Sequence, residues 1–247
     1  MPAALVVATY NIHRAIGRDG VFDPDRVAGV LAEVDADVIA LQEVQTGATG
    51  RNLLHLFRDR LGAEAVHGVT MLQRDAEFGN VLLTRHRVVS AERLDLSVAR
   101  REPRGALDVV LDCRGRPLRV LATHLGLWPY ERRRQVKQLL AALGDETWLP
   151  TVLMGDLNEW FLWGRPLRWL HVQFRRTPAP PTFPSPLPVL ALDRLWVRPR
   201  AALQRLDVHA TPLARMASDH LPLVATLSLP STPAVPRHAR MAEAPAA

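Results

Sequence analysis

The chain has 247 residues, of which 48% are hydrophobic, so it can bury a large core as one sizeable domain, which we favour, or as two small ones. Its single cysteine, Cys113, excludes a disulfide or a thiolate metal site within the chain, and a reducing compartment fits this composition. No run approaches the roughly 18 apolar residues that a membrane span needs, so we expect no integral membrane segment.

The net charge is +6, and Lys137 is the only lysine among 31 basic residues. This excess of arginine would suit a polyanionic partner such as nucleic acid or anionic lipid, but a solvated arginine-rich surface is the alternative. The chain enters its first predicted strand directly from Met1, without a basic leader region, so we expect a cytoplasmic protein. Residues 1–228 are predicted to form one domain, and residues 229–247, rich in Pro and Ala, a disordered tail.

The first part of the chain predicts a strand, a helix and a second strand. Leu5 to Tyr10 is a β-rich run that ends at Asn11. Asp23-Pro24-Asp25 supplies an N-cap, a first-turn proline and a first-turn acid for a helix. Asp37 to Leu41 is a continuous apolar strand that ends at Gln42-Glu43. In such a βαβ unit, ligand groups belong at the carboxyl ends of the strands, where Asn11 and Glu43 lie.

The middle of the chain changes from helical to β patterns. A short helix is predicted over Asn52 to Leu61, and another opens at Pro129 with an apolar stripe that runs to Leu143. Between these helices, the alternation predicts strands over Phe78 to Thr84, Val88 to Leu94, Ala106 to Cys113, and Leu118 to Thr123. The last of these strands ends at His124.

The final third is organised around Gly155-Asp156-Leu157-Asn158, which follows the apolar strand Thr151 to Met154. Gly155 suggests a tight turn that presents the carboxylate and the amide on one side. Trp160 to Leu170 is predicted to be helical in part, and a proline-dense loop follows over Pro178 to Pro188, at the expected rim of the site. Further strands are predicted over Val189 to Val197, Leu203 to Val208, and Leu221 to Leu227.

Polar residues recur where the predicted strands end, start or break. They are Asn11, Glu43, His124, Asp156, Asn158, Asp193 and the pair Asp219-His220. Each one alone suits a cap or a turn. If they converge, they supply oxygen ligands for a hard divalent ion, and histidines that stabilise charge at a phosphate. The lack of a thiolate cluster and of a close histidine pair argues against zinc.

These residues lie in ordered motifs that resemble those of the endonuclease/exonuclease/phosphatase superfamily over residues 5 to 228. The motifs are Thr9-Tyr10-Asn11-Ile12, Leu41-Gln42-Glu43-Val44, Gly79-Asn80, Thr123-His124-Leu125, Gly155-Asp156-Leu157-Asn158, Leu192-Asp193-Arg194 and Ser218-Asp219-His220. The resemblance implies an α/β fold, a four-layer sandwich of two packed mixed β-sheets flanked by helices. It also implies hydrolysis of phosphoester bonds with Mg²⁺, for which Mn²⁺ can substitute.

The resemblance further implies a role for each residue. Glu43 would be the principal metal ligand, with Asn11 beside it and Asp219 as a further ligand. Asp156 would handle the proton of the nucleophile or leaving group, and Asn158 would hold the scissile phosphate. Asp193 would orient His220, and His220 and His124 would contact the phosphate oxygens. Water would attack in line, without a covalent intermediate.

Three further residues are assigned to substrate binding, namely Asn80, Arg104 and Thr182. Arg104 and the run Arg132 to Arg134 would bind a second phosphate or simply form surface charge. Trp128, Trp160 and Trp163 follow catalytic strands, so they form either an apolar wall for the substrate or part of the core.

The chain departs from the abasic-site endonucleases at Gln45 and His13 and is more similar to bacterial phosphodiesterases, sphingomyelinase-like enzymes and secreted deoxyribonucleases. We therefore expect a monomeric, Mg²⁺-dependent phosphodiesterase whose substrate is phospholipid-derived, a small molecule or nucleic acid. A nuclease acting on DNA or RNA is the first alternative. A non-catalytic anion-binding module of the same fold is the second.

Overall fold

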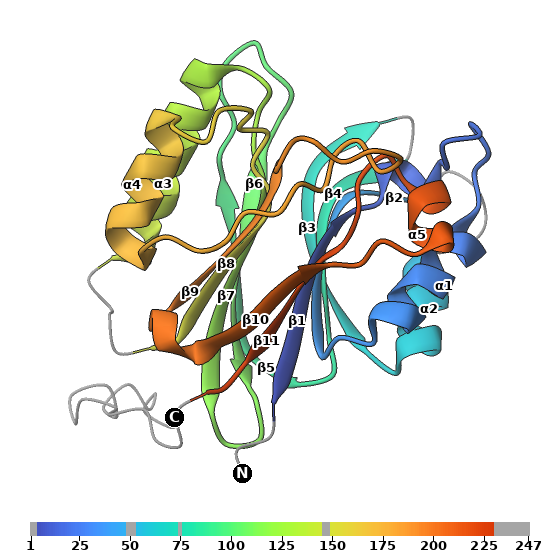
Figure 1. The fold of residues 1–247 in the computed structure, drawn as a ribbon, viewed down its shortest axis with the longest axis horizontal. Coiled ribbons are helices and arrows are strands. Elements are labelled where there is room, and N and C mark those ends of the chain that lie inside the picture. The colour runs from blue at the N-terminus through green and yellow to red at the C-terminus, as the bar shows by residue number, and fades with distance from the viewer. Residues whose placement is uncertain (1–3, 48–52, 74–75, 145–148, 230–247) are drawn as a thin grey trace, which may run out of the picture.

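The computed structural model describes residues 4–47, 53–73, 76–144 and 149–229, and their strands form two β-sheets (Figure 1). The first sheet has six strands in the order β10 (Leu203–Val208), β11 (Leu223–Leu227), β1 (Leu5–Asn11), β2 (Val38–Thr46), β4 (Ala76–Thr84) and β3 (Glu64–Gln73). The second has five strands in the order β5 (Arg87–Asp95), β6 (Gly105–Asp112), β7 (Pro117–His124), β8 (Thr151–Asp156) and β9 (Asp193–Arg198). Both sheets are mixed, because β1 and β2 pair in parallel, as do β7 and β8.

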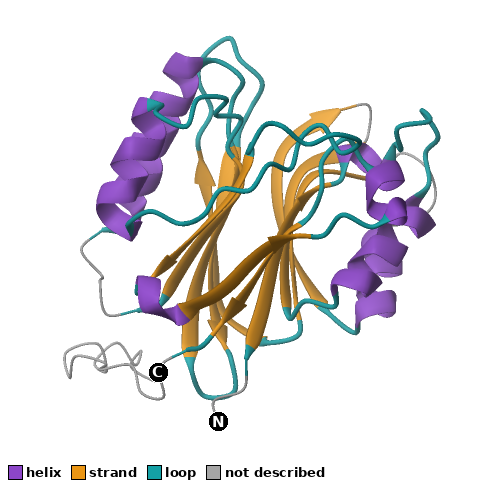
Figure 2. Cartoon of the chain, viewed as in Figure 1, coloured by secondary structure: helices purple, strands orange, loops and turns teal. Residues whose placement is uncertain are grey.

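Helices cover the outer face of each sheet (Figure 2). The first sheet carries α1 (Pro24–Val34), α2 (Leu53–Leu61) and α5 (Pro212–Ala217), and the second carries α3 (Pro129–Leu143) and α4 (Arg165–Phe174). Two short 3₁₀ helices, η1 (His13–Ala15) and η2 (Arg200–Ala202), complete the described elements. The predicted four-layer α/β sandwich is therefore confirmed. No described helix is long and apolar enough to cross a membrane.

Three apolar clusters hold the four layers together. One lies between the two sheets, and each of the other two lies between a sheet and its helices. The helix stripes predicted from the sequence bury the expected side chains, such as Val27 and Leu31 of α1 and Val136 and Leu139 of α3. Within each strand, alternate residues point to the inter-sheet cluster and to the helices. Side chains at the strand ends that point to the inter-sheet face therefore lie at one edge of the sandwich.

Most predicted strands and helices are present, and the differences have local causes. Strand β3 and helix α5 were not predicted, because β3 carries a mixed polar pattern and α5 is only six residues long. The segment before Arg165 is a turn rather than a helix, and β9 begins at Asp193 rather than at Val189. Asn52 and residues 230–247 lie outside the described residues.

The role of Gly155 also differs from the prediction. It does not turn the chain, because β8 continues to Asp156 and pairs with strands on both sides. Its φ is +149°, and a Cβ atom here would lie 1.8 Å from the carbonyl oxygen of Thr123. Glycine is required because the neighbouring strand passes too closely for any side chain.

We expect Gly155→Ala to lower the free energy of unfolding by at least about 2 kcal/mol, because the backbone contact cannot relax without shifting β7 or β8. Chemical denaturation would measure this loss. Gly115→Ala is the control, since Gly115 also has a positive φ but a Cβ atom there meets open space. Equal losses in the two variants would show that backbone strain alone, not the close strand, requires Gly155.

Candidate active site

The strand register of the second sheet brings three predicted site residues together. His124, the last residue of β7, pairs with Asp156, the last residue of β8, and Asp156 pairs with Asp193, the first residue of β9. In each strand, the residues two and four positions further into the sheet belong to the inter-sheet cluster. Because side chains alternate between the two faces of a strand, all three polar side chains point to the inter-sheet side, at the edge between the sheets.

The first sheet adds Asn11 and Glu43 to the same edge. Asn11 ends β1 and lies in register with Gln42 of β2. A β-bulge between Leu41 and Val44 inserts an extra residue, and Glu43 takes a φ of +56°. Leu41 and Val44 both pack on the helix side, so the bulge directs Glu43 to the inter-sheet edge. Regular alternation would not have placed it there.

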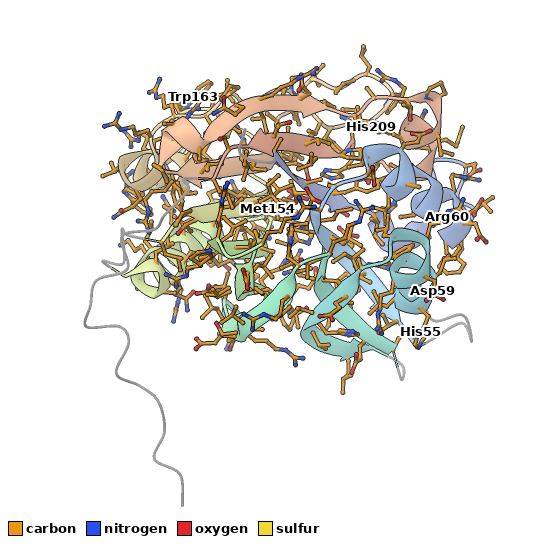
Figure 3. The ribbon with its side chains drawn as sticks, turned by 90° about the horizontal axis from the view of Figure 1, so that it is seen from below. His55, Asp59, Arg60, Met154, Trp163 and His209 are labelled. Carbon is orange, nitrogen blue, oxygen red and sulfur yellow. The ribbon has the colours of Figure 1, made fainter. Side chains whose placement is uncertain are left out.

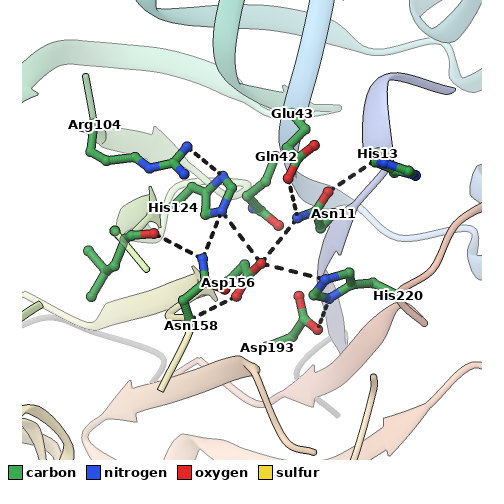
Figure 4. A network of polar contacts seen from close by, with 12 residues as sticks. Asn11, His13, Gln42, Glu43, Arg104, His124, Asp156, Asn158, Asp193 and His220 are labelled. Carbon is green, nitrogen blue, oxygen red and sulfur yellow. Dashed lines mark hydrogen bonds and ion pairs between the residues drawn. The ribbon is translucent and has the colours of Figure 1, made fainter. Parts of the chain in front are cut away.

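Asp156 is the centre of the polar network (Figure 4). Its Oδ2 accepts a hydrogen bond from Asn11 Nδ2 at 3.1 Å, and its Oδ1 accepts one from the backbone N–H of Asn158 at 2.9 Å. Asn11 Nδ2 also donates to Glu43 Oε1 at 3.2 Å. One amide group thus holds two carboxylates near each other, and Asp156 is only 1% exposed.

Asp193 and His220 form a buried ion pair, with 2.8 Å between Asp193 Oδ2 and His220 Nδ1. The His220 Nε2 atom faces Asp156 Oδ2 at 3.7 Å. Burial by itself lowers the pKa of His220, but the carboxylates of Asp193 and Asp156 outweigh it and raise this pKa to about 10. The imidazole is therefore protonated at neutral pH. The ring of Phe183, from the proline-dense loop, packs 4.9 Å from the His220 ring.

His124 differs from His220 in its charge. Its Nε2 lies 3.0 Å from Asn158 Nδ2, and its Nδ1 lies 3.4 Å from the Arg104 guanidinium. Both neighbours are donors, so a protonated ring would face donors at each nitrogen. Burial and the charge of Arg104 lower the pKa of His124 to about 3. Arg104 and His220 are therefore cations of the site, whereas His124 is neutral.

These groups line one cleft of about 280 Å³. Its walls include Asn11, Glu43, Arg104, His124, Asp156, Asn158, Asp219 and His220, and thus eight of the eleven predicted site residues. Asp193 lies directly behind His220, fully buried. The loops that follow the strands of both sheets gather around this edge, at the top of the view in Figure 1.

Two residues assigned to substrate binding lie behind the cleft instead. Thr182 is fully buried, and its hydroxyl donates to Asp193 Oδ2 at 2.6 Å, so it holds the carboxylate in place. Asn80 donates to the Gly105 carbonyl at 3.0 Å and is 3% exposed. Arg132 is also buried, and it pairs with Glu159. It therefore offers no charge to a second phosphate.

Some cleft residues were not predicted from the sequence. Arg14 and Phe78 line the cleft and contact each other, with the guanidinium 5.4 Å from the ring centre. Glu102 also lines it and pairs with Arg104 at 3.2 Å. None of the three lies at a strand end of the kind that drew attention to the other residues. Arg104, which lies directly before β6, and the Gly79-Asn80 motif, which directly follows Phe78, pointed to this region.

Metal binding is compatible with this arrangement. Among the described residues, Asp156, Asp193 and His220 form a group in which one ligand atom from each lies within 4.8 Å of the others, so they could hold a metal ion. Asp193 Oδ1 is buried and has no hydrogen-bond partner in the described part of the chain. An unpaired carboxylate oxygen in this buried group is compatible with a bound cation.

A comparison with protein families matches residues 8–220 to the model of the "Endonuclease/Exonuclease/phosphatase family". The chain belongs to this family. YbhP of Escherichia coli (strain K12), a curated protein that is itself uncharacterized, is 31% identical over 248 residues, covering 90% of this chain and 96% of YbhP.

Solved structures agree with this membership. An endonuclease/exonuclease/phosphatase from Beutenbergia cavernae has a TM-score of 0.75 at 26% identity, covering 92% of this chain and 72% of that chain. The human Nocturnin catalytic domain, solved with a bound sulfate anion, has a TM-score of 0.73 at 19% identity, covering 93% of this chain and 94% of that chain. At that identity, the Nocturnin likeness shows the fold alone.

Proposed function

We propose that this protein is a Mg²⁺-dependent phosphodiesterase that cleaves a P–O bond by in-line attack of water. The proposal rests on one observation above all, the position of Asp156. This carboxylate lies between the neutral ring of His124, 3.5 Å away, and the protonated ring of His220, 3.7 Å away. A proton acceptor beside a fixed cation suits the hydrolysis of an anionic ester.

The donor set supports a hard, oxygen-preferring cation rather than zinc. Glu43 and Asp219 line the cleft with carboxylates, which is the ligand chemistry of Mg²⁺, and Asn11 lies beside Glu43. His220 is a poorer ligand, because the two carboxylates favour its protonated form. We therefore assign the metal to Glu43, with Asn11 and Asp219 beside it and Mn²⁺ as a substitute. A bound Mg²⁺ would neutralise charge on the phosphate oxygens.

The protein's own residues would accept the proton, stabilise charge and position the phosphate. Asp156 takes the proton of the attacking water, because its carboxylate is held by two amide donors and stays fixed in direction. Protonated His220 stabilises the negative charge that builds on the phosphate in the transition state. Asn158 lines the cleft where we place the scissile phosphate, and the contacts of its Nδ2 with His124 and the Leu125 carbonyl fix the position of the side chain. Arg104 supplies a second positive charge at the far wall.

A substrate panel tests the proposal. It contains bis-p-nitrophenyl phosphate, phospholipids, inositol phosphates, RNA, and single- and double-stranded DNA, each with Mg²⁺, with Mn²⁺ and with EDTA. We expect turnover of a diester that EDTA abolishes. Preferential cleavage of DNA or RNA would favour the nuclease. If no diester is hydrolysed with either metal, the proposal fails and an anion-binding module remains.

A further inference from the structure

Four consecutive large apolar side chains are exposed directly after the catalytic strand β8. Trp160, Phe161, Leu162 and Trp163 are 58%, 53%, 60% and 73% exposed. Trp163 lies at the periphery of the molecule (Figure 3). Single exposed apolar residues are ordinary on protein surfaces, but a contiguous group of this kind marks an interaction surface. Trp163 is therefore not part of the core, and it is not a wall for the substrate either, because it does not line the cleft.

The loop after β7 adds to this surface. Leu127, Trp128 and Tyr130 are 60%, 53% and 42% exposed. Leu127 and Trp160 both line the catalytic cleft, so the two loops meet at its mouth. We call the exposed apolar residues of 127–130 and 160–163 the rim patch. The patch borders the opening through which a substrate enters.

Buried polar contacts fix the backbone of both loops. Arg132 donates to the Leu127 carbonyl at 2.6 Å and to Glu159 Oε2 at 3.2 Å, so a single side chain ties the loops together. Glu159 also accepts from the backbone N–H of Phe161 at 3.2 Å. At Gly164, a Cβ atom would lie 2.5 Å from the Glu159 carboxyl carbon, so the turn packs tightly against the Glu159 side chain. The rim patch is thus preformed, and a partner need not order it.

Most exposed charges around the rim patch are cationic, and Glu102, beside Leu127 and Trp128, is an exposed acid. In the described residues 126–144 and 149–168, the acids Glu131, Asp156 and Glu159 are buried. In the same residues, Arg134, Lys137, Arg165 and Arg168 are exposed. Arg101, from the neighbouring loop, is also exposed and stacks on Trp128 with 4.9 Å between the guanidinium and the ring centre. The patch therefore combines aromatic side chains with exposed positive charge.

We propose that the rim patch docks the protein on the surface of an anionic phospholipid bilayer. Tryptophan and tyrosine prefer the membrane–water interface, where their rings are half solvated, and arginine and lysine bind anionic headgroups there. Phe161, Leu162 and Trp163 enter the interface, while Arg165 and Arg168 contact the headgroups. Docking in this orientation turns the mouth of the cleft toward the lipid.

Vesicle sedimentation in EDTA tests this docking without any contribution from hydrolysis. The full chain is mixed with vesicles of phosphatidylcholine and phosphatidylglycerol in equal parts, or of phosphatidylcholine alone. We expect binding to the anionic vesicles that weakens in high salt. The variant Phe161→Ser/Leu162→Ser/Trp163→Ser should lose at least about tenfold in partitioning. It should still hydrolyse the soluble diester at the wild-type rate, since these residues do not line the cleft.

Two further variants test whether binding depends on the rim patch in particular and on the positive charges beside it. Leu72→Ser/Val89→Ser removes exposed apolar residues of β3 and β5, which are 76% and 53% exposed, and should bind vesicles as the wild type does. Arg165→Glu/Arg168→Glu should bind anionic vesicles more weakly. Wild-type protein that stays in the supernatant, or a triple-serine variant that sediments like the wild type, overturns the proposal. Concentration-dependent dimers that only the triple-serine variant loses, without vesicle binding, would instead assign the patch to a second copy of the chain.

Discussion

Asp193→Asn is expected to keep the fold and to lower kcat by at least about 100-fold. Asp193 Oδ2 accepts from both Thr182 and His220, whereas Oδ1 has no hydrogen-bond partner among the described residues. An asparagine can place its oxygen at the first position and its NH₂ group at the second, so both existing contacts survive. What is lost is the negative charge that keeps His220 protonated.

The pH dependence of kcat distinguishes this electrostatic role from a merely structural one. In the wild type, the raised pKa of His220, about 10, keeps the ring protonated through neutral pH. In Asp193→Asn, the effect of burial, which lowers the pKa, is opposed only by the more distant carboxylates, so the pKa falls. The pH above which activity declines should therefore move downward. Thr182→Val is the control, because it removes one hydrogen bond to Asp193 but leaves the charge. A near-normal kcat in Asp193→Asn would remove Asp193 from the mechanism.

Glu43→Gln is expected to abolish nearly all activity together with most of the stabilisation by Mg²⁺. A ligand that binds only the folded form stabilises it by RT ln(1 + [L]/Kd), about 2.7 kcal/mol at a hundredfold excess over Kd. For a chain of this size, that corresponds to a rise in Tm of roughly 5–10 °C. The glutamine keeps an oxygen for the hydrogen bond from Asn11 but loses the charge that attracts the cation.

The same variant also reports on the strain in the metal-free protein. Glu43 and Asp156 accept from the same Asn11 amide, so two carboxylates lie close together without a cation between them. Removing one charge should leave the Tm in EDTA at or above that of the wild type. Glu92→Gln, on the exposed strand β5, makes the same chemical change away from the cleft and should keep the full Mg²⁺ shift. If Glu43→Gln is destabilised in EDTA yet shifts fully with Mg²⁺, then Glu43 is a structural acid and the metal lies elsewhere.

The elements that carry the site can be predicted from the amino-acid pattern alone. Apolar runs that end in Asn11, His124 and Asp156 predict buried strands. A run of apolar side chains indicates burial, and the polar residue that follows marks the end of the strand. The ordered motifs around them also indicated the family, and both the family and the four-layer fold are confirmed. These features involve residues that are close together in the sequence, so the sequence pattern is enough to predict them.

How these residues act on one another depends on the three-dimensional fold. The register of β7, β8 and β9 brings His124, Asp156 and Asp193 side by side, and the bulge in β2 turns Glu43 toward them. The contrast between a neutral His124 and a protonated His220 depends on which charges lie nearby in space. Thr182 and Arg132 proved to be buried supports, whereas Trp160 and Trp163 are exposed. Burial and electrostatic environment arise from contacts between distant parts of the chain, which no local pattern of residues specifies.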